Sequence, residues 1–145
     1  MRLALVLVAA IGLAVCGWRS LGAQQPAPPS SRSVWDGVYT AAQARSGALT
    51  SGLCTSCHGD SFEGDRGPAL TGAEFVGRWD GRTVGDLFEL IRLTMPDDDP
   101  GALTRQQYAD LVAYILSTNK FPAGKAELGR DVAVLKEIRF EGNKP

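Results

Sequence analysis

The stretch Cys54-Thr55-Ser56-Cys57-His58 (CTSCH) decides how the rest of this 145-residue chain is interpreted. Two cysteines separated by two residues occur in zinc sites, in redox-active dithiols and at covalent attachment sites for a cofactor. A structural zinc site needs four ligands, usually as two spaced pairs, and the chain has no second pair. A thioredoxin-like dithiol lies in a βαβ context, which no segment of the sequence predicts. The first two interpretations are therefore poor.

The histidine that follows Cys57 favours the third interpretation, because Cys-x-x-Cys-His is the attachment motif of c-type haem. Each thiol can add to one vinyl group of a single porphyrin, and His58 then lies under the iron as its proximal ligand. In an oxidising compartment the two thiols of Cys54 and Cys57 would otherwise form a disulfide, whereas thioether bonds engage both. The sequence therefore predicts one covalently bound haem c with its iron.

Met95 is the expected second axial ligand. His58 is the only histidine, so two histidine ligands from one chain are excluded. Methionine is the other common ligand of an electron-carrying haem, and Met1 lies in a segment that export would remove. An isolated methionine more often fills a gap in a core. An iron that needs a second ligand favours the ligand role for Met95.

Two further residues are expected at the site. The carbonyl of Pro68, ten residues after His58, would accept a hydrogen bond from the other ring nitrogen of that histidine. An ordinary turn proline is the equally weighted alternative. The indole N–H of Trp79 would donate to a haem propionate, in preference to Arg78 or Arg82, with core packing as its alternative role.

The first 23 residues have the pattern of a secretory signal peptide. A positive start precedes an apolar run from Leu3 to Val15, which is shorter than the about 20 residues of a membrane-spanning helix. Cleavage is expected after Ala23, and the mature protein is expected in the periplasm. Lipidation at Cys16, giving an inner-membrane lipoprotein, and retention of the segment as an anchor are the alternatives. Any membrane attachment is thus expected only through the N-terminus.

The remaining chain divides into three parts. Residues 24–33 (QQPAPPSSRS) are rich in proline, glutamine and serine and predict a flexible linker. Residues 34–124 form the expected domain, and residues 125–145 are an extension that packs on it or is partly disordered. Without residues 1–23 the chain has 13 basic and 16 acidic residues, a balance that argues against nucleic acid as a partner.

The domain is predicted to be all-α, with three to five short helices wrapped around the haem. Helices are expected over about residues 41–53 and 72–76, after Thr83 and after Thr104, with a last weak helix over 131–138. No stretch alternates long enough to predict a strand. Gly47 either permits a close crossing of the first and fourth helices or only weakens the first. Four threonines each precede an acceptor side chain by three residues, the pattern of a capping box: Thr40 and Gln43, Thr71 and Glu74, Thr83 and Asp86, Thr104 and Gln107.

Several motifs together resemble a class I monohaem cytochrome c over roughly residues 34–124. They are Cys54-x-x-Cys57-His58, Gly67-Pro68-x-Leu70, Trp79, and Thr94-Met95-Pro96 followed by a tyrosine-bearing helix. Other stretches resemble the small cytochromes associated with bacterial quinoprotein dehydrogenases, namely Met95-Pro96 with Pro100-Gly101, Tyr108, Ala113-Tyr114-Ile115-Leu116 and Phe121-Pro122-Ala123-Gly124. The resemblance implies that His58 and Met95 are the axial pair and that Cys54 and Cys57 carry the thioethers. It also implies that the Pro68 carbonyl faces the histidine and that Trp79 lies at the propionates.

The resemblance implies an electron carrier and not an enzyme. Single electrons would pass from a periplasmic dehydrogenase to a respiratory oxidase or another cytochrome, and no small-molecule substrate would bind the iron. Two alternatives stay open. One is the electron-accepting subunit of a quinoprotein alcohol dehydrogenase, and the other is a haem-based gas sensor in which Met95 is a labile ligand.

Overall fold

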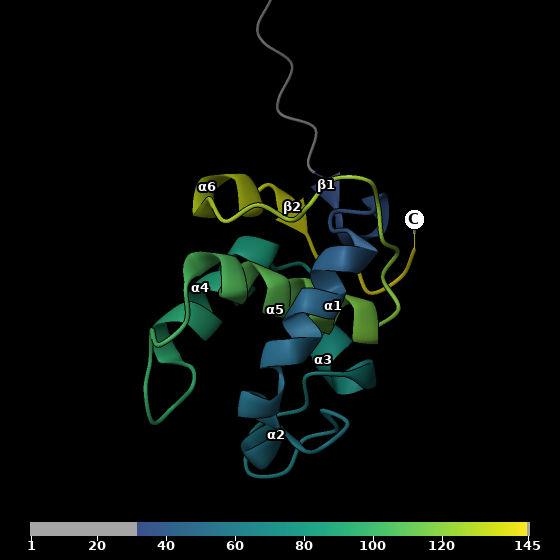
Figure 1. Ribbon diagram of the computed structural model, residues 1–145. Coiled ribbons are helices and arrows are strands. Elements are labelled where there is room, and N and C mark those ends of the chain that lie inside the picture. The colour runs from purple at the N-terminus through teal and green to yellow at the C-terminus, as the bar shows by residue number, and fades with distance from the viewer. Residues whose placement is uncertain (1–31, 145) are drawn as a thin grey trace, which may run out of the picture.

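The computed structural model describes residues 32–144, which are mainly helical (Figure 1). The expected all-α fold is confirmed. The predicted signal peptide, Cys16 and residues 24–31 of the predicted linker lie outside the described residues. None of the helices within residues 32–144 has the length and apolar character needed to cross a membrane. In chain order the elements are β1 (Arg32–Ser33), the 3-10 turn η1 (Val34–Asp36), α1 (Ala41–Thr50), α2 (Gly52–His58), α3 (Gly72–Trp79), α4 (Val84–Thr94), α5 (Arg105–Thr118), α6 (Val132–Leu135) and β2 (Ile138–Arg139).

Two of the four predicted capping boxes are complete. At the start of α4 the Thr83 hydroxyl accepts from the backbone N–H of Asp86 at 3.1 Å, and the Asp86 carboxylate accepts from the N–H of Thr83 at 3.0 Å. Thr104 and Gln107 make the same reciprocal pair at the start of α5. Each box satisfies two backbone donors that the first helical turn leaves without a partner. The local sequence therefore fixes where both of these helices begin.

The other two boxes are incomplete because longer-range contacts take one partner. Thr40 does cap α1 through the N–H of Gln43, but the Gln43 amide bonds the backbone N–H and carbonyl of Leu128 instead of returning to Thr40. Thr71 precedes α3 without capping it, since its hydroxyl donates to the carbonyl of Phe62 at 3.0 Å. The predicted reciprocal bonds at these two helices were wrong.

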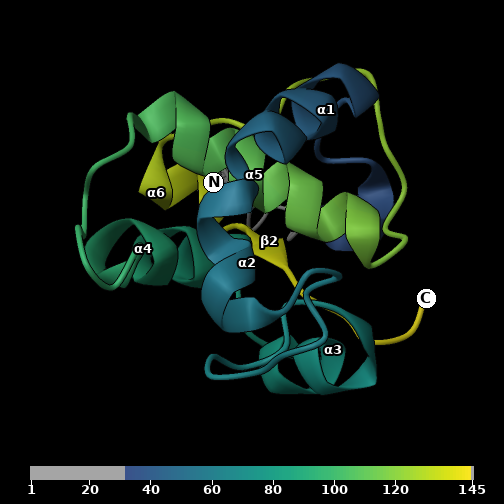
Figure 2. The ribbon, with the colours of Figure 1, turned by 60° about the horizontal axis from the view of Figure 1, so that its bottom comes forward.

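Helices α1 and α5 cross closely, as Figures 1 and 2 show. The closest approach is at Gly47 of α1. A Cβ atom at Gly47 would lie 1.9 Å from the carbonyl oxygen of Asp110 and 2.9 Å from the Cβ of Tyr114. The predicted close crossing is confirmed. The expected single helix over 41–53 is divided, because α1 ends at Thr50 and α2 begins at Gly52.

The apolar faces of α4 and α5 are buried in one core, in which α5 packs against both α4 and α1. Their buried side chains are Val84, Leu87, Phe88 and Ile91 on α4 and Tyr108, Leu111, Val112, Ile115 and Leu116 on α5. Burial of these faces is the main favourable contribution to the stability of the domain.

The C-terminal extension packs on the helices. Phe140 is 2% exposed, and its ring centroid lies 5.8 Å from that of Trp79, 6.0 Å from that of Phe75 and 6.1 Å from that of Phe121. Trp35 continues this aromatic cluster, with its ring 4.9 Å from Phe121 in an edge-on arrangement. The cluster thereby joins the beginning, the middle and the end of the described chain.

A two-stranded parallel pair closes the domain, with Arg32 opposite Ile138 and Ser33 opposite Arg139. Arg32 and Ser33 had been placed at the end of the linker, yet they form β1 and Ser33 is buried. The predicted last helix is also shorter, because only Val132–Leu135 is helical and Ile138 is in β2. Both differences come from pairing between segments more than 100 residues apart, which no local pattern in the sequence reveals.

Candidate functional site

Helix α2 carries the CTSCH stretch and ends at His58. In both views it lies between α3 on one side and α4 on the other (Figures 1 and 2). Cys54 and Cys57 are partly exposed and form no disulfide. Residues three apart on a helix share a face. The two thiols therefore project from one side of α2, with Cys54 about one turn before the buried His58 and Cys57 directly before it.

A hydrogen bond at one ring nitrogen fixes the orientation of His58. Its Nδ1 lies 2.6 Å from the carbonyl oxygen of Pro68. A carbonyl oxygen can only accept, so Nδ1 carries the proton and the lone pair of the neutral ring is on Nε2. Nε2 has no hydrogen-bond partner among residues 32–144. The expected contact between Pro68 and His58 is present, and it leaves Nε2 available to a metal.

Gly67 lies directly against the same imidazole. A Cβ at this position would be 2.9 Å from both Cε1 and Nδ1 of His58 and 3.3 Å from the carbonyl oxygen of Cys57. The N–H of Gly67 also donates to that carbonyl at 2.7 Å. Only a residue without a side chain allows the backbone to pass so close to the ring, so Gly67 and Pro68 together set the ring's position.

Met95 follows α4 directly and is partly buried against the core. Its backbone carbonyl accepts a hydrogen bond from the hydroxyl of Tyr108 at 2.9 Å. Tyr108 is on α5 and 1% exposed, so α5 holds the position of the segment that carries Met95. This hydrogen bond was not predicted from the sequence, although a tyrosine at a buried helix position suggests one, because a buried hydroxyl needs a partner.

Trp79 is not brought together with His58. Its ring is 4% exposed and packs in the aromatic cluster with Phe75 and Phe140, and the guanidinium of Arg82 lies 5.2 Å from its centroid. Its indole N–H has no hydrogen-bond partner within residues 32–144. The core-packing role that the sequence left open is thus present, and the propionate role stays a prediction.

The residues present fit a haem. The donor set is one imidazole nitrogen, one thioether and two thiols at thioether spacing. Leu53 directly precedes Cys54, and Leu90 and Leu93 lie on α4 ahead of Met95; all three are exposed, at 54%, 48% and 57%. Exposed leucines beside polar donors suit contact with an apolar porphyrin.

A metal site built from side chains alone is not supported. No group of three or more His, Cys, Asp and Glu side chains within residues 32–144 is arranged to hold a metal ion. Burial also raises the pKa of the Cys54 thiol above its usual value. The thiolate is the form that binds metals, so this thiol is a poorer metal ligand than a free cysteine.

A family model described as cytochrome c oxidase, cbb3-type, subunit III matches residues 41–115, just over half of the chain. The matched range begins with α1 and includes α2, the Pro68 segment, Met95 and most of α5. The chain belongs to this family and is a class I c-type cytochrome. Membership implies haem c as cofactor, electron transfer as the activity and redox proteins as partners. Searches of curated proteins and of solved structures found no match.

Proposed function

We propose that this chain is an exported monohaem cytochrome c that carries single electrons between a periplasmic dehydrogenase and a respiratory acceptor, with His58 and Met95 as axial ligands of the iron. The observation that carries the proposal is the His58 ring, held at Nδ1 by Pro68 with Nε2 free, on the same helix as the two unpaired cysteines Cys54 and Cys57. The bound haem would supply the one-electron chemistry of its iron.

The surrounding residues set the tautomer of His58 and the positions of both His58 and Met95. The carbonyl of Pro68 keeps the proton on Nδ1 of His58 and makes Nε2 a better donor. The Tyr108 hydroxyl holds the carbonyl of Met95 and so restrains where its thioether lies. With both axial positions filled by side chains, no substrate has access to the iron, which agrees with a carrier.

The Met95→Ala variant tests the ligand assignment. We expect the haem to stay attached, the long-wavelength ferric absorption band of an iron–thioether bond to disappear, and the reduction potential to fall, because thioether ligation favours ferrous iron. Val134→Ala, an exposed apolar residue on α6 outside the site, is the control and should keep the band. An unchanged spectrum and potential in Met95→Ala would show that another group is the ligand.

Carbon monoxide separates the carrier from the gas sensor. A carrier with a firmly held Met95 binds carbon monoxide only slowly in the reduced state, whereas a labile ligand admits it readily. Rapid binding by the wild-type protein would favour the sensor. Co-purification of the exported protein with a large quinoprotein dehydrogenase would instead favour the dehydrogenase subunit.

A further inference from the structure

Three consecutive residues after α2 pair in order with the last three residues of that helix. The guanidinium Nη2 of Arg66 donates to the carbonyl of Ser56. The N–H of Gly67 donates to the carbonyl of Cys57 at 2.7 Å, and Pro68 accepts from His58 Nδ1 at 2.6 Å. We call residues 66–68 the strap. Each pair is ten residues apart, so the strap follows the end of α2 in register.

The strap belongs to a complete set of bonds to the end of α2. The last four carbonyls of a helix have no partner within it. Here the carbonyl of Thr55 accepts from Gly59 N at 3.0 Å, and that of His58 accepts from Gly64 N at 2.8 Å. The Cys57 carbonyl is taken by the strap backbone. Only the carbonyl of Ser56, which lies between the two cysteines, depends on a side chain.

That side chain has other partners available and does not use them. Asp60, Glu63 and Asp65 lie in the same exposed loop, yet Arg66 forms no ion pair with any described carboxylate. A cation near a helix C-terminus is favoured by the helix dipole and by the free carbonyls. The guanidinium is therefore directed to the helix end and not to the surrounding negative charge.

We propose that Arg66 is the positioning residue of the iron ligand: it anchors the strap on Ser56 so that the Pro68 carbonyl stays on Nδ1 of His58. The other two bonds of the strap use main-chain atoms, the N–H of Gly67 and the carbonyl of Pro68, so Arg66 supplies its one side-chain bond to α2. The role in ligation rests on the function proposed above. The sequence signal that points to it is a single arginine immediately before Gly67-Pro68, ten residues after the middle of CTSCH.

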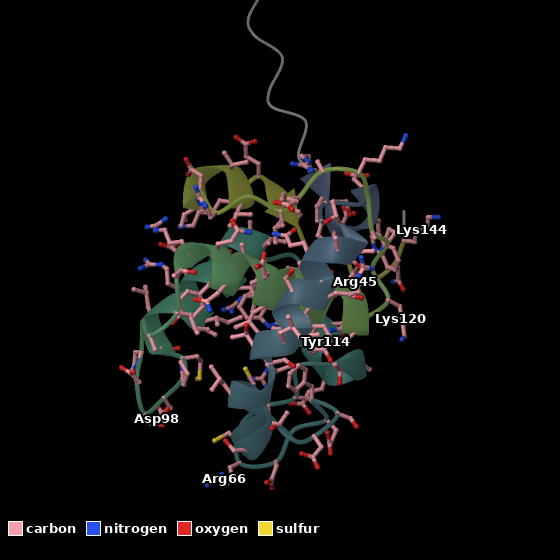
Figure 3. All side chains as sticks on the ribbon, in the orientation of Figure 1. Arg45, Arg66, Asp98, Tyr114, Lys120 and Lys144 are labelled. Carbon is pink, nitrogen blue, oxygen red and sulfur yellow. The ribbon has the colours of Figure 1, made fainter. Side chains whose placement is uncertain are left out.

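The test measures hydrogen exchange by NMR in the haem-loaded protein, at the Gly67 amide and at the His58 Nδ1 proton. We expect Arg66→Ala to accelerate the exchange of both protons about tenfold. Without the bond to Ser56, the free-energy cost of opening the strap locally is lower. Arg66→Lys keeps a cation and a donor and should recover part of the protection. Arg45→Ala is the matched control, since Arg45 is also exposed and lies well away from Arg66 (Figure 3).

Two results would overturn the proposal. One is exchange at Gly67 and at His58 that changes no more in Arg66→Ala than in Arg45→Ala. The other is equal acceleration of these protons and of the buried α5 amides, which would mean loss of global stability and not release of the strap. Failure of the proposed function is distinguishable, because a purified wild-type protein without covalent haem would show it before any variant is made.

Discussion

At the scale of the residue, backbone atoms set both the tautomer and the position of the His58 imidazole. Its tautomer depends on the Pro68 carbonyl, and its place depends on the bare Cα of Gly67. Sequence spacing suggested the first contact but not the second. The reason is that a missing Cβ gives no pattern of its own, and only the three-dimensional approach of 2.9 Å reveals what a side chain would displace.

Gly67→Ala is predicted to disturb the ligand without unfolding the domain. The added methyl would meet Cε1 and Nδ1 of His58, so the ring or the strap must move and the hydrogen bond to Pro68 must lengthen. A weaker bond at Nδ1 makes Nε2 a poorer donor to ferric iron, so we expect the reduction potential to rise. Gly52→Ala, on the helix that carries His58 and with open space around it, is the control for potentiometry and should leave the value unchanged.

At the scale of the element, the crossing of α1 and α5 depends on a single glycine. An alanine at Gly47 would place its methyl 1.9 Å from a backbone oxygen of α5, and a helix backbone cannot yield as a flexible side chain can. We predict that Gly47→Ala lowers the free energy of unfolding by at least about 1–3 kcal/mol. Gly77→Ala on α3 meets nothing within 4 Å and should raise it by about 0.5–1 kcal/mol. Denaturant titration of both variants measures the contrast, and equal effects would contradict it.

The capping box of α4 makes stability depend on pH. The hydroxyl of Thr83 donates to the Asp86 carboxylate at 2.7 Å and holds the pKa of that carboxyl below its usual value. Because the pKa is lowered by folding, the stabilisation is complete above the unfolded value and is lost as pH falls through the folded one.

We therefore predict that Asp86→Asn is less stable than wild type near neutral pH and that the difference shrinks between about pH 5 and pH 2. Thermal unfolding across this range measures it. Asp98→Asn removes the same charge from an exposed loop and is the control for the loss of one negative charge. A constant difference for Asp86→Asn would contradict the assignment.

Elements with complete local signals were predictable, and elements built by distant contacts were not. The starts of α4 after Thr83 and of α5 after Thr104 follow from caps within a few residues. β1 and the role of the Gln43 amide depend on residues 85 or more positions away, so the sequence around them shows nothing. The same holds at the site, where CTSCH was recognisable but the Arg66 contact was not.

At the scale of the whole molecule, the C-terminal extension completes the core that the helices begin. Leu128, Leu135, Ile138 and Phe140 are each at most 2% exposed. Phe140 contacts rings from α3 and from the segment after α5, and β2 pairs with β1. The extension therefore stabilises the part of the domain where α3, β1 and the segment after α5 meet.

Phe140→Ala is predicted to lower the free energy of unfolding by about 3–5 kcal/mol, because it removes a buried ring from a packed cluster. Val134→Ala, in the same extension and 46% exposed, should change it by less than about 0.5 kcal/mol. Since neither residue contacts His58, the visible spectrum of the folded variants should match wild type. A small effect of Phe140→Ala would mean that the extension is not part of the cooperative unit.

The central claim is that α2 holds one haem through Cys54 and Cys57. Intact mass spectrometry of the exported protein, under denaturing conditions that remove any non-covalent group, tests it most directly. We predict a mass equal to the mature chain plus one haem, and the loss of that addition when both cysteines are replaced by alanine. A wild-type protein with the mass of the bare chain would contradict the account.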